Sequence, residues 1–306
     1  INLTNNAATD IAPAIAPDGQ VAFQSDRDGN WEVYVVDGMG LSPVRLTDNP
    51  ADDTDPVWSP ICEERRLAFQ SNRDGHWEIY VSDGAPNTEW RLTESDGDST
   101  DPFWSPDGEW VAFQSNHDGN WEVYVINVAT GEERRLTDDA ASDVNPIWSP
   151  DGDAIAFQSD RDGNWEIYTV DMAGAALTRV TESAGEERNV TWSPDGEWLA
   201  FQSDRTGSWN IYISRPDGSD LRAVAPSLST NEAPTWNCES TLLVFHSDRE
   251  GNDELYRVDP FVRGAMPERL TNDPARDICP AWQPAEEDAS LWGLDPLSDV
   301  ILLLAQ

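Results

Sequence analysis

The chain has 306 residues, of which 58 are Asp or Glu and 19 are Arg, with no Lys, so its formal net charge is −39. A field of this sign repels polyanions, which excludes nucleic acid as a partner and disfavours anionic membrane surfaces. No run approaches the ~18 apolar residues of a membrane-spanning helix, so we expect no membrane insertion.

A 14-residue segment, AFQSDRDGNWEVYV at residues 22–35, recurs along the chain. The central Phe of the copies stands at positions 23, 69, 113, 157, 201 and 245, which are 46 and then 44 residues apart. Each apolar run is short, alternating and rich in Val, Ile, Tyr and Trp, which is typical of strands. A fixed period in the forties with four strands per unit predicts the blades of a β-propeller.

Each unit divides in the same order. It begins with an inner strand a, Pro-x-Trp-Ser-Pro, as at residues 56–60, and an Asp-Gly turn follows in most copies. Strand b is Ala-Phe-Gln-Ser, and a loop such as residues 26–30 leads to strand c, Trp-Glu-Val-Tyr-Val. Strand d ends in Arg-Leu-Thr, as at residues 45–47.

The two ends of the chain decide the number of blades. Residues 2–4 resemble a spare strand d and residues 280–282 a spare strand a. Spacing from Trp292 places residues 301–304 at the strand c positions. We therefore predict an all-β, single-domain protein over residues 1–306: a seven-bladed propeller of four-stranded blades, closed by an N-terminal strand d and C-terminal strands a–c, because such closure removes exposed sheet edges. The alternative is six blades with a loose tail.

The succession of WSPDG, AFQSDRDG, EIYV and RLT resembles the WD40-like PD40 repeat of the TolB propeller family, over nearly the whole chain. This resemblance implies a bacterial or archaeal protein, periplasmic or extracellular, that serves as a binding platform.

The d–a and b–c connections of a propeller emerge on one face, which we call the top face. An Asp or Asn recurs just before strand a, where it should ring the mouth of the central channel: Asp55, Asp101, Asn145 and Asn189. Converging oxygen ligands suit Ca²⁺, so these four are candidate metal ligands. The alternative is that they cap local turns through hydrogen bonds to the backbone.

The b–c loops add charged and aromatic groups to the same face. Asp26, Arg27 and Asp28 form the first such loop, and a Trp opens each following strand: Trp31, Trp77, Trp121 and Trp165. These seven residues are candidate binding residues for a protein, peptide or glycan. The loops also have a structural reason to exist as hairpin turns, and the Trp side chains can pack against the next blade. We interpret the inner-strand Trp series and the repeated strand b Gln, such as Gln24, as structural.

No catalytic constellation is visible. The chain has no Gly-x-Ser-x-Gly elbow. His76, His117 and His246 occupy different positions in their units and should not converge, and an intrachain disulfide among Cys62, Cys238 and Cys279 is not expected.

We therefore expect a monomeric, non-catalytic interaction module that uses the top face and the channel mouth, with Ca²⁺ as the candidate ion. Two alternatives remain open: a metal-dependent propeller enzyme (a polysaccharide lyase or hydrolase), and a structural module of a larger surface protein.

Overall fold

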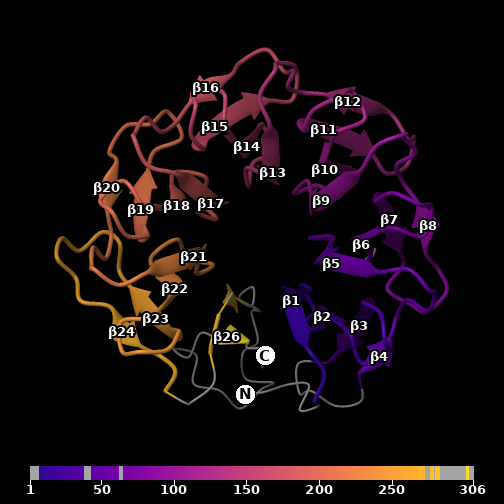
Figure 1. Cartoon of the computed structure of the whole chain (residues 1–306), viewed down its shortest axis with the longest axis horizontal. Helices are drawn as coiled ribbons and strands as arrows, with labels where there is room; N and C mark the ends of the chain where they lie inside the picture. Colours follow the sequence, from indigo (N-terminus) through magenta and orange to yellow (C-terminus); the bar gives the residue numbers. More distant parts are fainter. Residues whose placement is uncertain are drawn as a thin grey trace.

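The repeated segments fold as four-stranded antiparallel sheets arranged in a ring around a central channel (Figure 1). This computed structural model describes residues 7–37, 43–61, 65–272, 276–278, 280–282 and 301–302. Within this part of the chain, no helix is long and apolar enough to span a membrane.

Six complete blades follow one another in sequence, with strand a innermost and strand d outermost. The first three contain β1 (Asp10–Ile15), β2 (Val21–Ser25), β3 (Glu32–Val36) and β4 (Val44–Arg45); β5 (Asp53–Trp58), β6 (Leu67–Ser71), β7 (Glu78–Ser82) and β8 (Trp90–Arg91); and β9 (Ser99–Trp104), β10 (Trp110–Ser115), β11 (Glu122–Asn127) and β12 (Glu133–Arg135). The next three contain β13 (Asp143–Trp148), β14 (Ala154–Ser159), β15 (Glu166–Asp171) and β16 (Thr178–Arg179); β17 (Glu187–Trp192), β18 (Leu199–Ser203), β19 (Asn210–Ser214) and β20 (Arg222–Ala223); and β21 (Asn231–Trp236), β22 (Leu243–Ser247), β23 (Glu254–Val258) and β24 (Glu268–Arg269).

A two-stranded sheet lies between the first and sixth blades. Its strands β25 (Ala281–Trp282) and β26 (Ile301–Leu302) pair antiparallel, and β25 contacts both β1 and β21. The prediction of a seventh four-stranded blade is thus wrong for the described residues, and the alternative of six blades gives the right number. Residues 301–302 were predicted to form strand c, which would be separated from strand a by strand b. They instead pair directly with strand a, because hydrogen bonds to β25 set their position, and spacing along the chain does not. The proposed strand d at residues 2–4 and the segment around Trp292 lie outside the described residues.

The core lies between adjacent blades. Val33 and Val35 of the first blade pack in one cluster with Trp58 and Phe69 of the second. Within each blade the strand b Phe stacks on the strand c Tyr, as for Phe69, whose ring centroid is 5.8 Å from that of Tyr80. Alternation along the strands places these side chains on both faces of a buried sheet, so each blade is held by its neighbours.

The Arg-Leu-Thr motif of strand d has a structural cause. Glu32 is fully buried, and its carboxylate accepts hydrogen bonds from Arg45 Nη2 at 2.7 Å and Thr47 Oγ1 at 2.6 Å. Thr47 Oγ1 in turn accepts the Val33 N–H at 2.9 Å. A buried carboxylate is tolerated only with such partners, and the same arrangement recurs at Glu78, Glu122 and Glu254.

Candidate functional site

Every inner strand carries a bulge that turns one residue towards the channel. In the second blade Thr54 pairs with Gln70 and Val57 with Ala68, so Asp55 and Pro56 together oppose one residue of strand b. The bulged residue has a left-handed backbone in all six blades, with φ between 50° and 55°: Ala12, Asp55, Asp101, Asn145, Asn189 and Ala233. This conformation costs free energy for any residue with a side chain, although Asp and Asn tolerate it best, and such bulges re-aim side chains near functional sites.

A glutamine of the preceding blade fixes most of these bulges. Gln24 Oε1 accepts the Asp55 N–H at 2.8 Å, and Gln70 Oε1 accepts the Asp101 N–H at 3.0 Å. Gln114 and Gln202 bond Asn145 and Ala233 in the same way. The interpretation of the strand b glutamines as structural is thus confirmed for these four, which join neighbouring blades.

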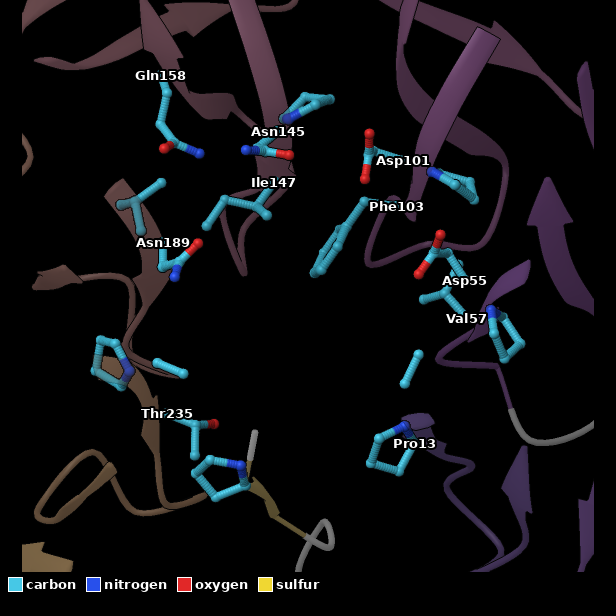
Figure 2. A pocket seen from close by; sticks show the side chains of 18 residues that line it. Pro13, Asp55, Val57, Asp101, Phe103, Asn145, Ile147, Gln158, Asn189 and Thr235 are labelled. Carbon is cyan, nitrogen blue, oxygen red and sulfur yellow. The ribbon is translucent and has the colours of Figure 1, made fainter. Parts of the chain in front are cut away.

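The bulges surround a cavity of about 480 Å³ at the mouth of the channel. Its wall includes Asp55, Asp101, Asn145 and Asn189, so the structure brings together all four residues that the sequence singled out as candidate metal ligands. Figure 2 shows Asp55 and Asp101 on one side and Asn145, Asn189 and Gln158 on the other. Phe103 and Ile147 project between the two sides. The cavity therefore has a carboxylate side, an amide side and an apolar floor.

Two carboxyl groups in this setting resist ionisation. Burial raises the pKa of Asp101 to about 6, and the neighbouring negative charge of Asp55 adds to the rise. Burial also raises the pKa of Asp55, against the hydrogen bond that Thr54 offers. No Arg or His lies among the described lining residues, so nothing in the wall neutralises the pair. A cationic group in the cavity would therefore favour the ionised form of both carboxyl groups.

Gln158 departs from the behaviour of the other glutamines. It is 2% exposed, it lines the cavity, and its Nε2 has no hydrogen-bond partner. Figure 2 shows its amide turned towards the cavity. Among the residues that the structure describes, no bond joins Gln158 Oε1 to the bulge at Asn189, whose Nδ2 instead donates to Gln202 Oε1 at 2.9 Å. Gln158 is thus a donor directed at the cavity.

The reason why the Gln158 amide has no partner lies on the neighbouring strand, β13. Gln70 Nε2 donates to Thr54 Oγ1 at 2.9 Å, and Gln114 Nε2 donates to Thr100 Oγ1 at 3.0 Å. Gln158 pairs with Val144 at the same register position, and valine offers no acceptor. Gln158 therefore lacks the threonine hydroxyl that holds the amides of Gln70 and Gln114.

The candidate binding residues of the first b–c loop are engaged within the protein. Asp26 Oδ1 accepts the Thr9 N–H at 2.9 Å, and Asp28 accepts the Tyr34 hydroxyl. Arg27 bonds Ser25 Oγ at 2.8 Å and Asp10 Oδ1 at 3.0 Å, with its guanidinium 4.3 Å from the centre of the Tyr34 ring. These groups fix the loop, which supports the structural alternative for it.

The candidate Trp residues at the start of strand c are half-buried: Trp31, Trp77, Trp121 and Trp165. Their backbones bond the first residue of the next inner strand, as where Trp31 O accepts the Asp53 N–H at 2.8 Å. None of the four lines the cavity. By contrast, Trp58, Trp104 and Trp148 of the inner strands pack in the clusters between blades, which confirms their structural role. Trp104 Nε1 donates to Val57 O of the preceding blade at 3.0 Å.

The remaining chemical groups lie away from the cavity. His76 bonds Glu78 at 2.9 Å and His117 bonds Ser115 Oγ at 2.8 Å, while His246 is buried in strand β22. In the described part of the chain, no three His, Cys, Asp or Glu side chains come together as a metal-binding group. Cys238 is a free thiol, and Cys62 and Cys279 lie outside the described residues.

A second pair of carboxyl groups is fully buried where the fourth and fifth blades meet: Glu166 of β15 and Glu187 of β17. Burial and the adjacent Glu166 carboxyl raise the pKa of Glu187 to about 7. Glu187 Oε1 accepts from Ser203 Oγ at 2.6 Å and Arg205 Nη2 at 3.0 Å, whereas Oε2 of both glutamates lacks a donor. A proton shared between the two carboxyl groups satisfies both oxygens.

The comparisons with known proteins agree with this architecture. The family model described as the TolB beta propeller domain, PD40, matches residues 2–100 and 87–191, together more than half of the chain. TolB from Acinetobacter baumannii is similar in structure, with a TM-score of 0.64 and 25% identity over 87% of this chain and 67% of that one. No curated protein matches the chain significantly.

Two further structures show the fold alone, because their identity is lower. A putative TolB from Agrobacterium tumefaciens is 23% identical, with a TM-score of 0.61 over 72% of this chain and 82% of that one. An oligogalacturonate lyase from Vibrio parahaemolyticus is 17% identical, with a TM-score of 0.71 over 92% of this chain and 87% of that one. Since one fold carries both kinds of protein, function must be argued from the cavity. The repeats, the ring of blades and the family match together establish that the chain belongs to the TolB β-propeller family.

Proposed function

We propose that this protein is a non-catalytic binding module that holds a cationic group of a protein or peptide partner in the mouth of its channel. The observation that carries this proposal is the cavity with Asp55 and Asp101 in its wall and no cationic residue among its described lining. In the unliganded protein, two half-buried carboxylates without a counter-ion lower the stability of the fold, and a bound cation relieves this cost.

The electrostatic field of the whole chain also favours a cationic ligand. A net charge of −39 attracts basic partners and speeds their association, most strongly at low salt. The cavity volume of about 480 Å³ falls in the range of sites that enclose a small molecule or a few residues of a peptide. A side chain or chain end that carries a positive charge fits both observations.

A metal ion is the other cation that this wall could hold. Asp55 and Asp101 would be its charged ligands, and Asn145 would add a neutral oxygen. Calcium accepts such donors but takes 6–8 oxygens, so water would have to complete its shell. We keep Ca²⁺ as the candidate ion, and membership of the TolB family supports a periplasmic or extracellular location.

The test uses a library of random hexapeptides screened against the wild-type protein and against Asp55→Asn/Asp101→Asn. Peptides with Lys or Arg should be enriched by the wild type, and their binding should fall by about tenfold or more in the double variant, because a charged hydrogen-bonded contact is lost. Calcium and EDTA are added separately to measure the contribution of the ion. Equal binding to both proteins would contradict the proposal, and turnover of a polysaccharide or ester substrate would contradict its non-catalytic part.

A further inference from the structure

We infer that the channel mouth recognises the free amino terminus of a peptide, with the α-ammonium group between Asp55 and Asp101 and the first carbonyl oxygen accepting a hydrogen bond from Gln158 Nε2. This inference rests on the proposed function and names its ligand. It depends on the juxtaposition of a carboxylate pair and an unpartnered amide donor across one cavity.

The amide side is what separates this ligand from a simple cation. An isolated metal ion or lysine ammonium would use the carboxylates and would leave Gln158 Nε2 without an acceptor. A buried donor without a partner is costly, so a ligand that supplies an acceptor on that side gains affinity. In the described structure no group of the chain bonds this atom.

A peptide amino terminus carries both groups on one residue. Its ammonium has three donors for carboxylate oxygens, and the carbonyl of the same residue is an acceptor. A free carboxylate is disfavoured at this position, because the wall already holds Asp55 and Asp101. An amino-terminal residue in amide linkage therefore matches the wall better than a free amino acid.

The floor indicates the side chain of that first residue. Phe103 and Ile147 project into the cavity, and Val57 and Val190 also line it. Phe103 is 38% exposed in the protein, which is unusual for a large apolar side chain of an inner strand. An aliphatic first residue would cover this surface, so we expect a peptide that begins with Leu, Ile or Val.

The experiment is calorimetric titration with the tripeptide Leu-Ala-Ala amide and with its N-acetylated form. Acetylation removes the positive charge and should weaken binding by about tenfold to a hundredfold, as for the loss of a charged hydrogen bond. Asp55→Asn and Asp101→Asn should each weaken binding of the free peptide.

A matched pair of variants isolates Gln158. Val144→Thr places a hydroxyl where Thr54 and Thr100 stand, which should tie back the Gln158 amide and weaken binding by about threefold to tenfold without a change of charge. Ile11→Thr introduces the same hydroxyl at the same register position beside Gln24, which already bonds Asp55 and does not line the cavity. Affinity should be unchanged there, and melting temperatures confirm that both variants fold.

Each outcome decides the matter. Equal binding of free and acetylated peptide, or binding of Ca²⁺ with no binding of peptide, would overturn the inference. Binding that needs the amino terminus but ignores Val144→Thr would overturn the role of Gln158. If tripeptides fail while internal Lys or Arg peptides still depend on Asp55 and Asp101, this inference falls and the proposed function stands. If nothing depends on the two carboxylates, both fall.

Discussion

Replacing Asp101 by Asn should stabilise the protein at neutral pH. The folded state raises the pKa of Asp101 from its ordinary 3.8 to about 6, chiefly through burial and then through the charge of Asp55. A rise of this size corresponds to about 3 kcal/mol of folding free energy, by which the ionised carboxyl destabilises the folded protein. We expect a gain of about 1–3 kcal/mol for Asp101→Asn above pH 7, because part of this cost relaxes.

The substitution keeps the surroundings of the side chain intact. Asparagine already occupies the equivalent bulge at Asn145 and Asn189, with φ of 53° and 51° beside 55° at Asp101. The amide oxygen can still accept from Thr100 Oγ1, now at 3.0 Å from Asp101 Oδ2, and the backbone N–H keeps Gln70. The difference between the two proteins is therefore mainly one charge.

The sign follows from the direction of the shift. Because the folded pKa lies above the unfolded one, the penalty is present above about pH 6 and vanishes below the unfolded value of 3.8. Chemical unfolding followed by Trp fluorescence, at pH 4 to 8.5 in low salt without divalent ions, should show an advantage of the variant that shrinks as the pH falls. Asp55 is the other titratable residue among the described lining, so its variant should follow the same trend.

Asp151→Asn provides a control, because it also removes one negative charge but should have the opposite effect on stability. Hydrogen bonds from Ser149 Oγ and the Asp153 N–H lower the pKa of Asp151. This carboxylate contributes stability at neutral pH that is lost as the pH falls, so its variant should be destabilised at pH 7. The reasoning would be refuted if Asp101→Asn were neutral or destabilising at pH 8, or if its effect did not change with pH.

Three further changes test other parts of the ring by chemical unfolding. Relative to the wild type, Glu187→Gln should become more stable as the pH rises from 5 to 8. The glutamine amide donates to Glu166 at every pH, whereas Glu187 loses its proton over this range; a stability difference that does not change with pH would contradict the shared proton. Thr93→Val should cost about 2–4 kcal/mol, because Glu78 loses a donor and the Ile79 N–H its acceptor; a neutral result would show that water replaces the hydroxyl. Gly97→Ala should cost about 1–3 kcal/mol, because its Cβ would lie 2.7 Å from the backbone of His117; unchanged stability would mean that the loop moves freely.

The blades could be predicted from the sequence because their signals are local. Alternation in strands b and c and the recurring turns fix each four-stranded unit without reference to the rest of the chain. The end of the ring could not be predicted in this way. Residues 301–302 carry no repeat motif, and their pairing with β25 depends on a strand about twenty residues away in sequence, for which spacing is no guide.

The position of the site could be predicted from the sequence, but the protonation and hydrogen bonding of its side chains could not. Topology alone places Asp55 and Asp101 at the channel mouth. The raised pKa of Asp101 needs the depth of the cavity, and the free amide of Gln158 needs its pairing with Val144 across 14 residues. A comparison of Val144 with Thr54 and Thr100 was the one signal in the sequence that could have identified Gln158.

The repeated bulge allows the groups at the channel mouth to be changed one blade at a time. In each blade the bulged residue sets which group faces the cavity, and the preceding residue can decide whether the paired glutamine is held or released, as Thr54 and Val144 show. Neither position belongs to the packed core between blades. Blade-by-blade exchange at these two positions would therefore generate propellers with the same scaffold and different ligand preferences, and the six blades supply the combinations.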